Sequence, residues 1–142
     1  MTLGKSYLPD IIMAMLFPVM ADYASKITAL TYSLPQSNKV TEKSYKSISD
    51  KAVRSHKNHL REGVYEIFKS KRFIRKFPQM KEVEELDYPP YQKCIIMLAG
   101  LDIEPVGIGD ILQTSIDSIL SLRSKRSEEI ERIFGRKSWM KK

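Results

Sequence analysis

Lysine and arginine are concentrated in residues 39–76 of this chain. The stretch holds twelve Lys or Arg residues and four acids, a net charge of +8, whereas the whole 142-residue chain carries +7. At about 100° per residue, six of these cations fall on one face of a helix. This basic stripe comprises Lys39, Lys43, Lys46, Arg54, Lys57 and Arg61. A row of cations along one helix face is typical of a surface that follows a phosphate backbone, so we expect nucleic acid to bind here.

Two aromatic residues interrupt the line of cations. Tyr65 and Phe68 are expected near the same helix face as Arg61, where their rings would stack on bases or wedge between them. The alternative is that both rings pack against another helix or another subunit. Beyond them the predicted nucleic-acid contacts continue with Lys69, Arg72, Arg75 and Lys76.

Residues 135–142 combine cations with an aromatic ring in the same way and are predicted to form a basic C-terminal tail. Trp139 would anchor the tail in a groove or on a neighbouring subunit. A regular row of cations matches phosphates better than base edges, so we expect little sequence specificity. The sequence does not distinguish DNA from RNA. The predicted contacts in the tail are Arg136, Lys137, Lys141 and Lys142.

Residues suited to catalysis or metal binding are few. His56 and His59 are the only histidines, and neither a cysteine nor a third histidine joins them at zinc spacing. His56 falls on the apolar side of its helix, which predicts a hydrogen-bonded core residue. A run of acids is more often solvated than bound to a metal; here the run is Glu82, Glu84, Glu85 and Asp87. We therefore expect a noncatalytic protein with no metal and no cofactor.

Cys94 is the single cysteine, so an internal disulfide is impossible. It lies in an apolar run, where we expect a buried thiol. The lack of a disulfide framework fits a reducing compartment, either intracellular or inside a virus particle. The longest uncharged apolar stretch, Ile11 to Ala21, has eleven residues. A transmembrane helix needs about 20 such residues, so we expect this stretch in the core.

The elements that position these residues are expected to be helices. Strand-like alternation and hairpin turn signals are missing, and four segments with helical periodicity are separated by proline or glycine. The sequence predicts an all-α, single-domain bundle of about four helices over residues 1–134. Pro18 is expected to kink or break the first helix, and Gly63 would be the point at which the second breaks. The predicted helices cover residues 9–33, 41–76, 91–101 and 108–134.

Charge is segregated in the second half of the chain. Residues 77–122 hold two basic and eight acidic residues, net −6, and residues 123–142 hold eight basic and three acidic residues, net +5. If these blocks pair between copies, the chain would assemble head to tail. If they pair within one chain, they neutralise each other. Both alternatives remain open.

Together these features predict a noncatalytic structural protein that binds nucleic acid. It would package or coat DNA or RNA through phosphate contacts and self-assembly, as a virus coat or nucleocapsid protein does. One alternative is a small helical subunit of a ribonucleoprotein or regulatory complex. Another is an adaptor that docks on an acidic protein or a membrane without nucleic acid. The expected partners are nucleic acid and further copies of the chain, and membrane contact is not expected.

Overall fold

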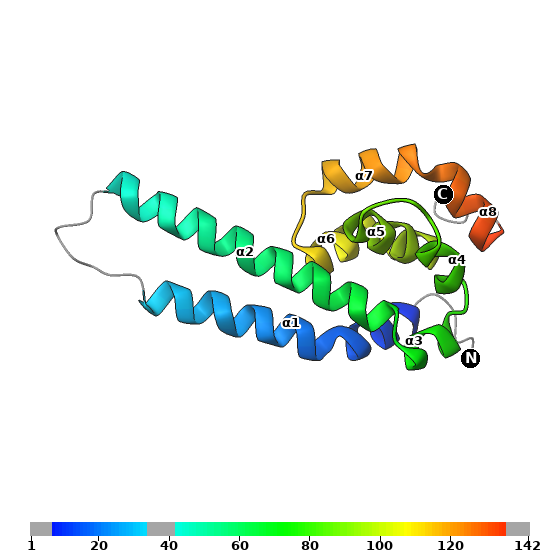
Figure 1. The fold of residues 1–142 in the computed structure, drawn as a ribbon, viewed down its shortest axis with the longest axis horizontal. Helices are drawn as coiled ribbons and strands as arrows, with labels where there is room; N and C mark the ends of the chain where they lie inside the picture. Colours follow the sequence, from blue (N-terminus) through cyan, green and yellow to red (C-terminus); the bar gives the residue numbers. More distant parts are fainter. Residues whose placement is uncertain (1–6, 34–41, 136–142) are drawn as a thin grey trace.

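The computed structural model describes residues 7–33 and 42–135, and within these ranges the chain forms helices and no strand. The predicted all-α class is confirmed. Two long helices form a hairpin, and the shorter helices gather at one end of it (Figure 1). In order, the helices are α1 Tyr7–Ser33, α2 Glu42–Phe68, α3 Lys71–Lys76, α4 Met80–Glu84, α5 Pro90–Gly100, α6 Pro105–Leu112, α7 Ile116–Lys125 and α8 Ser127–Phe134.

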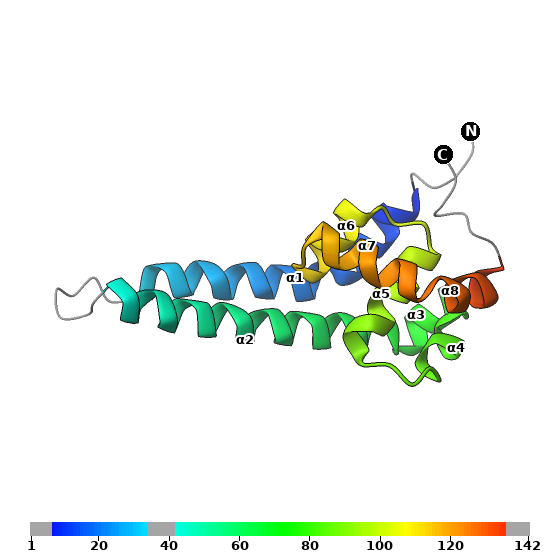
Figure 2. The ribbon, with the colours of Figure 1, turned by 90° about the horizontal axis from the view of Figure 1, so that it is seen from above.

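Helices α1 and α2 run antiparallel and side by side (Figures 1 and 2). The chain does not break at Pro18, although proline removes one backbone hydrogen bond there. Gly63 does not break α2 either. A Cβ atom at Gly63 would lie 2.8 Å from a Cγ atom of Val19, so the missing side chain lets the two helices approach closely.

The second helix ends eight residues earlier than predicted, at Phe68. Ser70 then begins α3 as its N-cap, because its hydroxyl accepts a hydrogen bond from the Phe73 amide at 3.2 Å. The same hydroxyl donates to the carbonyl of Ile67 at 2.6 Å. This serine therefore satisfies backbone groups on both sides of the break.

Helix α5 forms the centre of the core. Pro90 occupies its first turn, where a missing N–H costs nothing, and residues 94–99 are all buried. Helices α2, α4, α6, α7 and α8 pack around it. A helix that is apolar on all sides belongs in such a central position. The expected burial of Cys94 is confirmed.

The predicted fourth helix is in fact divided into α6, α7 and α8. Gln113 ends α6 in the left-handed conformation, with φ 54°, and Ser115 caps α7 through a 3.2 Å hydrogen bond from the Ser118 amide. The spacing of apolar residues stays helical through these breaks because each of the three short helices points an isoleucine toward the same core. Ile108, Ile119 and Ile130 are all fully buried. Within the described residues the chain is a helical hairpin joined to a cluster of short helices, and the predicted bundle of about four helices is not confirmed.

Helix α1 is only partly covered by the rest of the molecule. Ile12 and Leu16 are fully buried, as predicted, but Phe17 is 68% exposed. By length and composition alone, the 23 residues from Asp10 to Tyr32 would suffice to cross a membrane, and only 11% of the most apolar window is buried. The eleven residues from Ile11 to Ala21 are too short to cross a bilayer, but the helix that contains them is long enough.

Candidate nucleic-acid interface

Of the six cations of the basic stripe, the structure describes the side chains of Arg54, Lys57 and Arg61, and these three differ in exposure. Lys39 lies outside the described residues, and Lys43 and Lys46 belong to a part of α2 whose side chains are not described. Arg54 is exposed on the free part of the hairpin, whereas Lys57 and Arg61 are half-buried where the short helices begin to pack against α2. The predicted solvent-exposed face therefore ends near Lys57.

Arg61 is held by the chain itself. Its Nε donates a hydrogen bond to the Leu112 carbonyl and its Nη2 donates to the Gln113 carbonyl, both at 2.9 Å. The guanidinium also lies over the Tyr91 ring, 4.8 Å from its centroid. An arginine has five N–H donors, so these two bonds leave donors for a ligand. Arg61 thus has a structural role that the periodicity of the stripe did not predict.

The turn that receives Arg61 is built by short-range contacts. The Thr114 amide donates to the Gly109 carbonyl at 3.2 Å, and the Gln113 side-chain amide donates to the Asp110 carbonyl at 2.8 Å. A Cβ atom at Gly109 would lie 2.9 Å from the Thr114 carbonyl oxygen, so only glycine allows this approach without a shift. Gly107 and Gly109 both lie inside α6.

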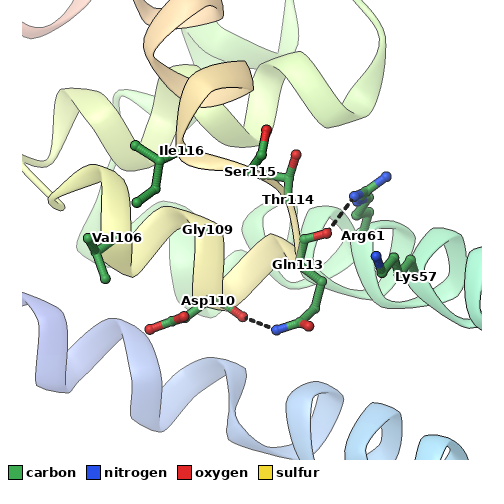
Figure 3. A pocket seen from close by; sticks show the side chains of 9 residues that line it. All are labelled: Lys57, Arg61, Val106, Gly109, Asp110, Gln113, Thr114, Ser115 and Ile116. Carbon is green, nitrogen blue, oxygen red and sulfur yellow. Dashed lines mark hydrogen bonds between the residues drawn. The ribbon is translucent and has the colours of Figure 1, made fainter.

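A pocket of about 530 Å³ lies between α2 and this turn (Figure 3). Within the described residues, no hydrogen bond or ion pair occupies the ammonium group of Lys57. The Asp110 carboxylate also lines the pocket, but Figure 3 shows it pointing away from the two cations. A partly buried positive charge attracts anions more strongly than a fully solvated one. The lining residues are Lys57, Arg61, Val106, Gly109, Asp110, Gln113, Thr114, Ser115 and Ile116.

Gln113, Thr114 and Ser115 line the pocket but are not among the residues that the sequence predicted for the site. The Thr114-Ser115 pair was visible as a helix start, because serine is a favoured N-cap. Its approach to α2 was not visible, because Arg61 and Gln113 are 52 residues apart in the chain.

Phe68 is part of the core and does not line the surface. It is fully buried, and its ring centroid lies 4.5 Å from that of Phe73. The prediction that Phe68 shares an exposed face with Arg61 is therefore wrong, because short helices pack over this part of α2. The alternative prediction, that this ring packs against another helix, is correct for Phe68.

Tyr65 is half-buried and makes polar contacts within the chain. Its hydroxyl donates to Glu84 Oε2 at 3.1 Å, and the ammonium groups of Lys69 and Lys93 lie 4.8 and 5.8 Å from its ring centroid. Burial, followed by the hydrogen bond to Glu84, raises the pKa of Tyr65 to about 12. The ring faces two cations of its own chain, and the structure does not present it as a free stacking platform.

A second group of cations lies on and before α3. Lys69 forms an ion pair with Glu66 at 2.9 Å, and that bond raises the pKa of Lys69. The cations of α3 itself are exposed, and they include Lys71, which sequence reasoning left out although it lies in the same basic run. This α3 group consists of Lys71, Arg72, Arg75 and Lys76. The predicted tail contacts Arg136, Lys137, Lys141 and Lys142, with Trp139, lie outside the described residues.

The two histidines differ in their surroundings. In the described part of the chain no group of three or more His, Cys, Asp or Glu residues is placed to hold a metal ion. His59 is exposed. His56 is half-buried, but its Nδ1 atom has no hydrogen-bond partner among the described residues, so the predicted hydrogen bond of a core histidine is missing at this atom. Burial raises the pKa of the Cys94 thiol, which keeps it protonated and unreactive.

Polar contacts join the acidic block, residues 77–122, to the basic block, residues 123–142, within the chain. Tyr88 donates a hydrogen bond to Glu129 at 2.6 Å, and the Arg126 guanidinium lies 3.9 Å from the centroid of the Tyr88 ring. Arg126 Nε also donates to Gln92 at 3.0 Å. These contacts attach α8 and the end of α7 to the segment that begins α5.

Comparison with protein-family models, curated proteins and solved structures finds no match to this chain.

Proposed function

We propose that this chain is a noncatalytic protein that binds nucleic acid through backbone phosphates and assembles along it. In this role it would package or coat DNA or RNA, as a virus coat or nucleocapsid protein does, inside a cell or a virus particle. The observation that carries the proposal is the pocket of about 530 Å³ beside Lys57 and Arg61. Phosphate oxygens are the ligands that an unpaired lysine and a partly engaged arginine would recognise there.

The geometry of the pocket suits a phosphate on electrostatic grounds. Lys57 supplies a point charge, and the fixed guanidinium of Arg61 supplies directed donors at no further cost in side-chain entropy. Arg54 lies about one helical turn before Lys57 on α2 and is exposed. A strand whose phosphate enters the pocket would therefore meet a further cation along the hairpin.

The α3 group provides a second place of contact. Its four cations lie within a six-residue helix that follows the C-terminal end of α2. Two separate groups of cations would contact separate phosphates of a bound strand, and such contacts give affinity without reading bases.

Salt dependence tests the proposal directly. We would titrate the full chain into fluorescently labelled single-stranded and duplex oligonucleotides and measure anisotropy at several salt concentrations. Each phosphate contact contributes a slope of about −0.9 on duplex DNA and about −0.7 on single strands. The double variants Arg54→Gln/Lys57→Gln and Arg72→Gln/Arg75→Gln should each make the slope shallower by about 1 to 2.

Lys26→Gln is a matched control, because Lys26 lies on α1 and is already paired with Asp22 at 3.0 Å. It should leave both affinity and slope unchanged. A slope near zero for the unmodified chain would contradict the proposal. Electron microscopy of the complexes then separates the functions: filaments indicate coating, whereas one discrete complex indicates a ribonucleoprotein subunit.

A further inference from the structure

Two exposed apolar side chains line the same pocket as Lys57 and Arg61. Val106 on α6 is 56% exposed, and Ile116 at the start of α7 is 44% exposed. A phosphate group alone would use the cations of the pocket and would leave these two side chains in water. Ligand sites combine an apolar lining with a few polar groups that fix the orientation of the ligand. The apolar wall therefore indicates a ligand that is larger than a phosphate group.

The pocket has a cationic side and an apolar side. Figure 3 shows Lys57 and Arg61 of α2 on one side, and Val106 of α6 with Ile116 of α7 on the other. Its volume of about 530 Å³ falls within the range of about 300 to 1,000 Å³ that is typical of small-molecule and cofactor sites. The pocket can therefore hold a phosphate group and an uncharged ring together.

The Asp110 carboxylate indicates the orientation of such a ligand. It points away from the two cations, and within the described residues it accepts no hydrogen bond and forms no ion pair. A carboxylate repels a phosphate, but it accepts hydrogen bonds from neutral N–H and O–H groups. The amino groups of bases are donors of this kind. The phosphate therefore belongs beside the cations, and the uncharged part of the ligand belongs beside Asp110.

We propose that the pocket takes one nucleotide of an unpaired strand, with its phosphate at Lys57 and Arg61 and its base against Val106 and Ile116. This inference rests on the proposed function, since it adds a place for the base to the phosphate contact. A base enters such a pocket only when it is unpaired, so the site selects single-stranded segments. Apolar side chains pack on the face of any base, so the contact adds affinity with little sequence preference.

A nucleotide within a strand matches the surroundings of the pocket better than a free nucleotide does. Arg54 is exposed about one helical turn before Lys57, and the α3 group follows the other end of the same helix. These cations would contact further phosphates of the strand. A free nucleotide would occupy the pocket alone and would leave them unused.

An abasic strand separates the base contact from the phosphate contacts. We would measure the anisotropy of a labelled single strand, and of a strand of equal length whose sugars carry no bases, with the full chain at one salt concentration. The unmodified chain should bind the normal strand more tightly by about fivefold or more. In Val106→Thr/Ile116→Thr this ratio should fall toward one, because threonine keeps the β-branched shape and replaces an apolar group by a hydroxyl.

Leu120→Thr is the matched control, because Leu120 is 43% exposed on α7 but lies outside the pocket. It should leave the ratio unchanged, and melting temperatures show whether each variant is folded. A ratio of one for the unmodified chain, or a ratio that Val106→Thr/Ile116→Thr does not lower, would overturn the inference. Salt-dependent binding of the abasic strand would then still support the proposed function. If neither strand binds, the proposed function fails and the inference fails with it.

Photocrosslinking locates the base directly. A single strand that contains 4-thiothymidine should link to residues 105–116 on irradiation, and annealing of the complementary strand should abolish this link. Links confined to α3 would overturn the inference. Free thymidine monophosphate should displace the strand only at concentrations far above those at which the strand itself competes, because it lacks the further phosphate contacts. If it competes as well as the strand does, the pocket is a site for free nucleotides and the inference is wrong.

Discussion

The guanidinium of Arg61 and the carbonyl oxygen of Gln113 are joined by a hydrogen bond of 2.9 Å between the middle of α2 and the end of α6. Gln113 has a φ of 54°, an uncommon conformation for a residue other than glycine. That conformation ends α6 and turns the chain toward the N-cap of α7. The same turn forms one wall of the pocket that contains Lys57.

Arg61→Gln should destabilise the fold, because it removes two charge-assisted hydrogen bonds to otherwise unsatisfied helix-end carbonyls. We expect a loss of about 2 kcal/mol in the free energy of unfolding, measured by urea titration. Arg54→Gln, an identical change at an exposed position on the same helix, should alter it by less than about 0.5 kcal/mol. Equal stabilities for the two variants would show that Arg61 does not hold the turn.

Lys57→Gln should weaken anion binding while leaving the fold intact, because the Lys57 ammonium has no partner among the described residues. We expect tripolyphosphate, a small mimic of linked phosphates, to raise the melting temperature of the unmodified chain. The rise should be clearly smaller in Lys57→Gln. Lys81→Gln, at an exposed position on α4, serves as the control. If Lys57→Gln and the unmodified chain respond alike, the pocket is not the phosphate site.

The fold class could be predicted from the sequence, but the helix boundaries could not. Periodicity shows which residues face the core, and it continues through breaks when consecutive helices pack on the same core. Ile67 and Ile74 are both half-buried on either side of the break at Ser70, so the pattern alone indicated one helix. The N-cap serines Ser70 and Ser115 were the available local signals.

The site could be predicted only in part, because it depends on contacts between distant segments. The angular position of Arg54 follows from helix geometry, and it is exposed as expected. Phe68 lies close to Arg61 in helical angle, yet it is fully buried because other helices pack over that part of α2. A helical wheel places a side chain around its own axis, and it contains no information on which neighbouring helix covers it.

The stability contributed by Tyr65 should depend on pH. Burial and the hydrogen bond to Glu84 raise the pKa of Tyr65 to about 12 from an ordinary value of 10.0, so the folded state favours the neutral phenol. This contribution is fully present below pH 10 and is lost as the pH rises through 12. We expect the stability difference between the unmodified chain and Tyr65→Phe to shrink over that interval.

The tyrosinate absorbance of the two proteins provides the measurement for Tyr65. Subtracting the titration of Tyr65→Phe from that of the unmodified chain should leave one group that ionises near pH 12. Burial and a hydrogen bond to Glu129 also raise the pKa of other tyrosines, Tyr23 and Tyr88 respectively, but both are present in the two proteins and cancel in the difference. A difference curve centred at pH 10 would contradict the contact with Glu84.

Gly100→Ala should destabilise the protein because the Phe134 ring lies directly against this glycine. A Cβ atom at Gly100 would be 2.1 Å from Cε2 of Phe134, which forces the ring or α8 to move. We expect a loss of about 1 to 3 kcal/mol in the free energy of unfolding, the usual cost of overpacking. Gly107→Ala is the control, since a Cβ atom at Gly107 would lie 3.1 Å from its nearest neighbour, a side-chain methyl of Ile103. Alanine is favoured over glycine in a helix by about 1 kcal/mol, so this control should change little or gain stability.

In the double variant Gly100→Ala/Phe134→Leu, removal of the ring should make the glycine substitution nearly neutral. If Gly100→Ala is instead as stable as Gly107→Ala, the Phe134 ring does not hold α8 against α5.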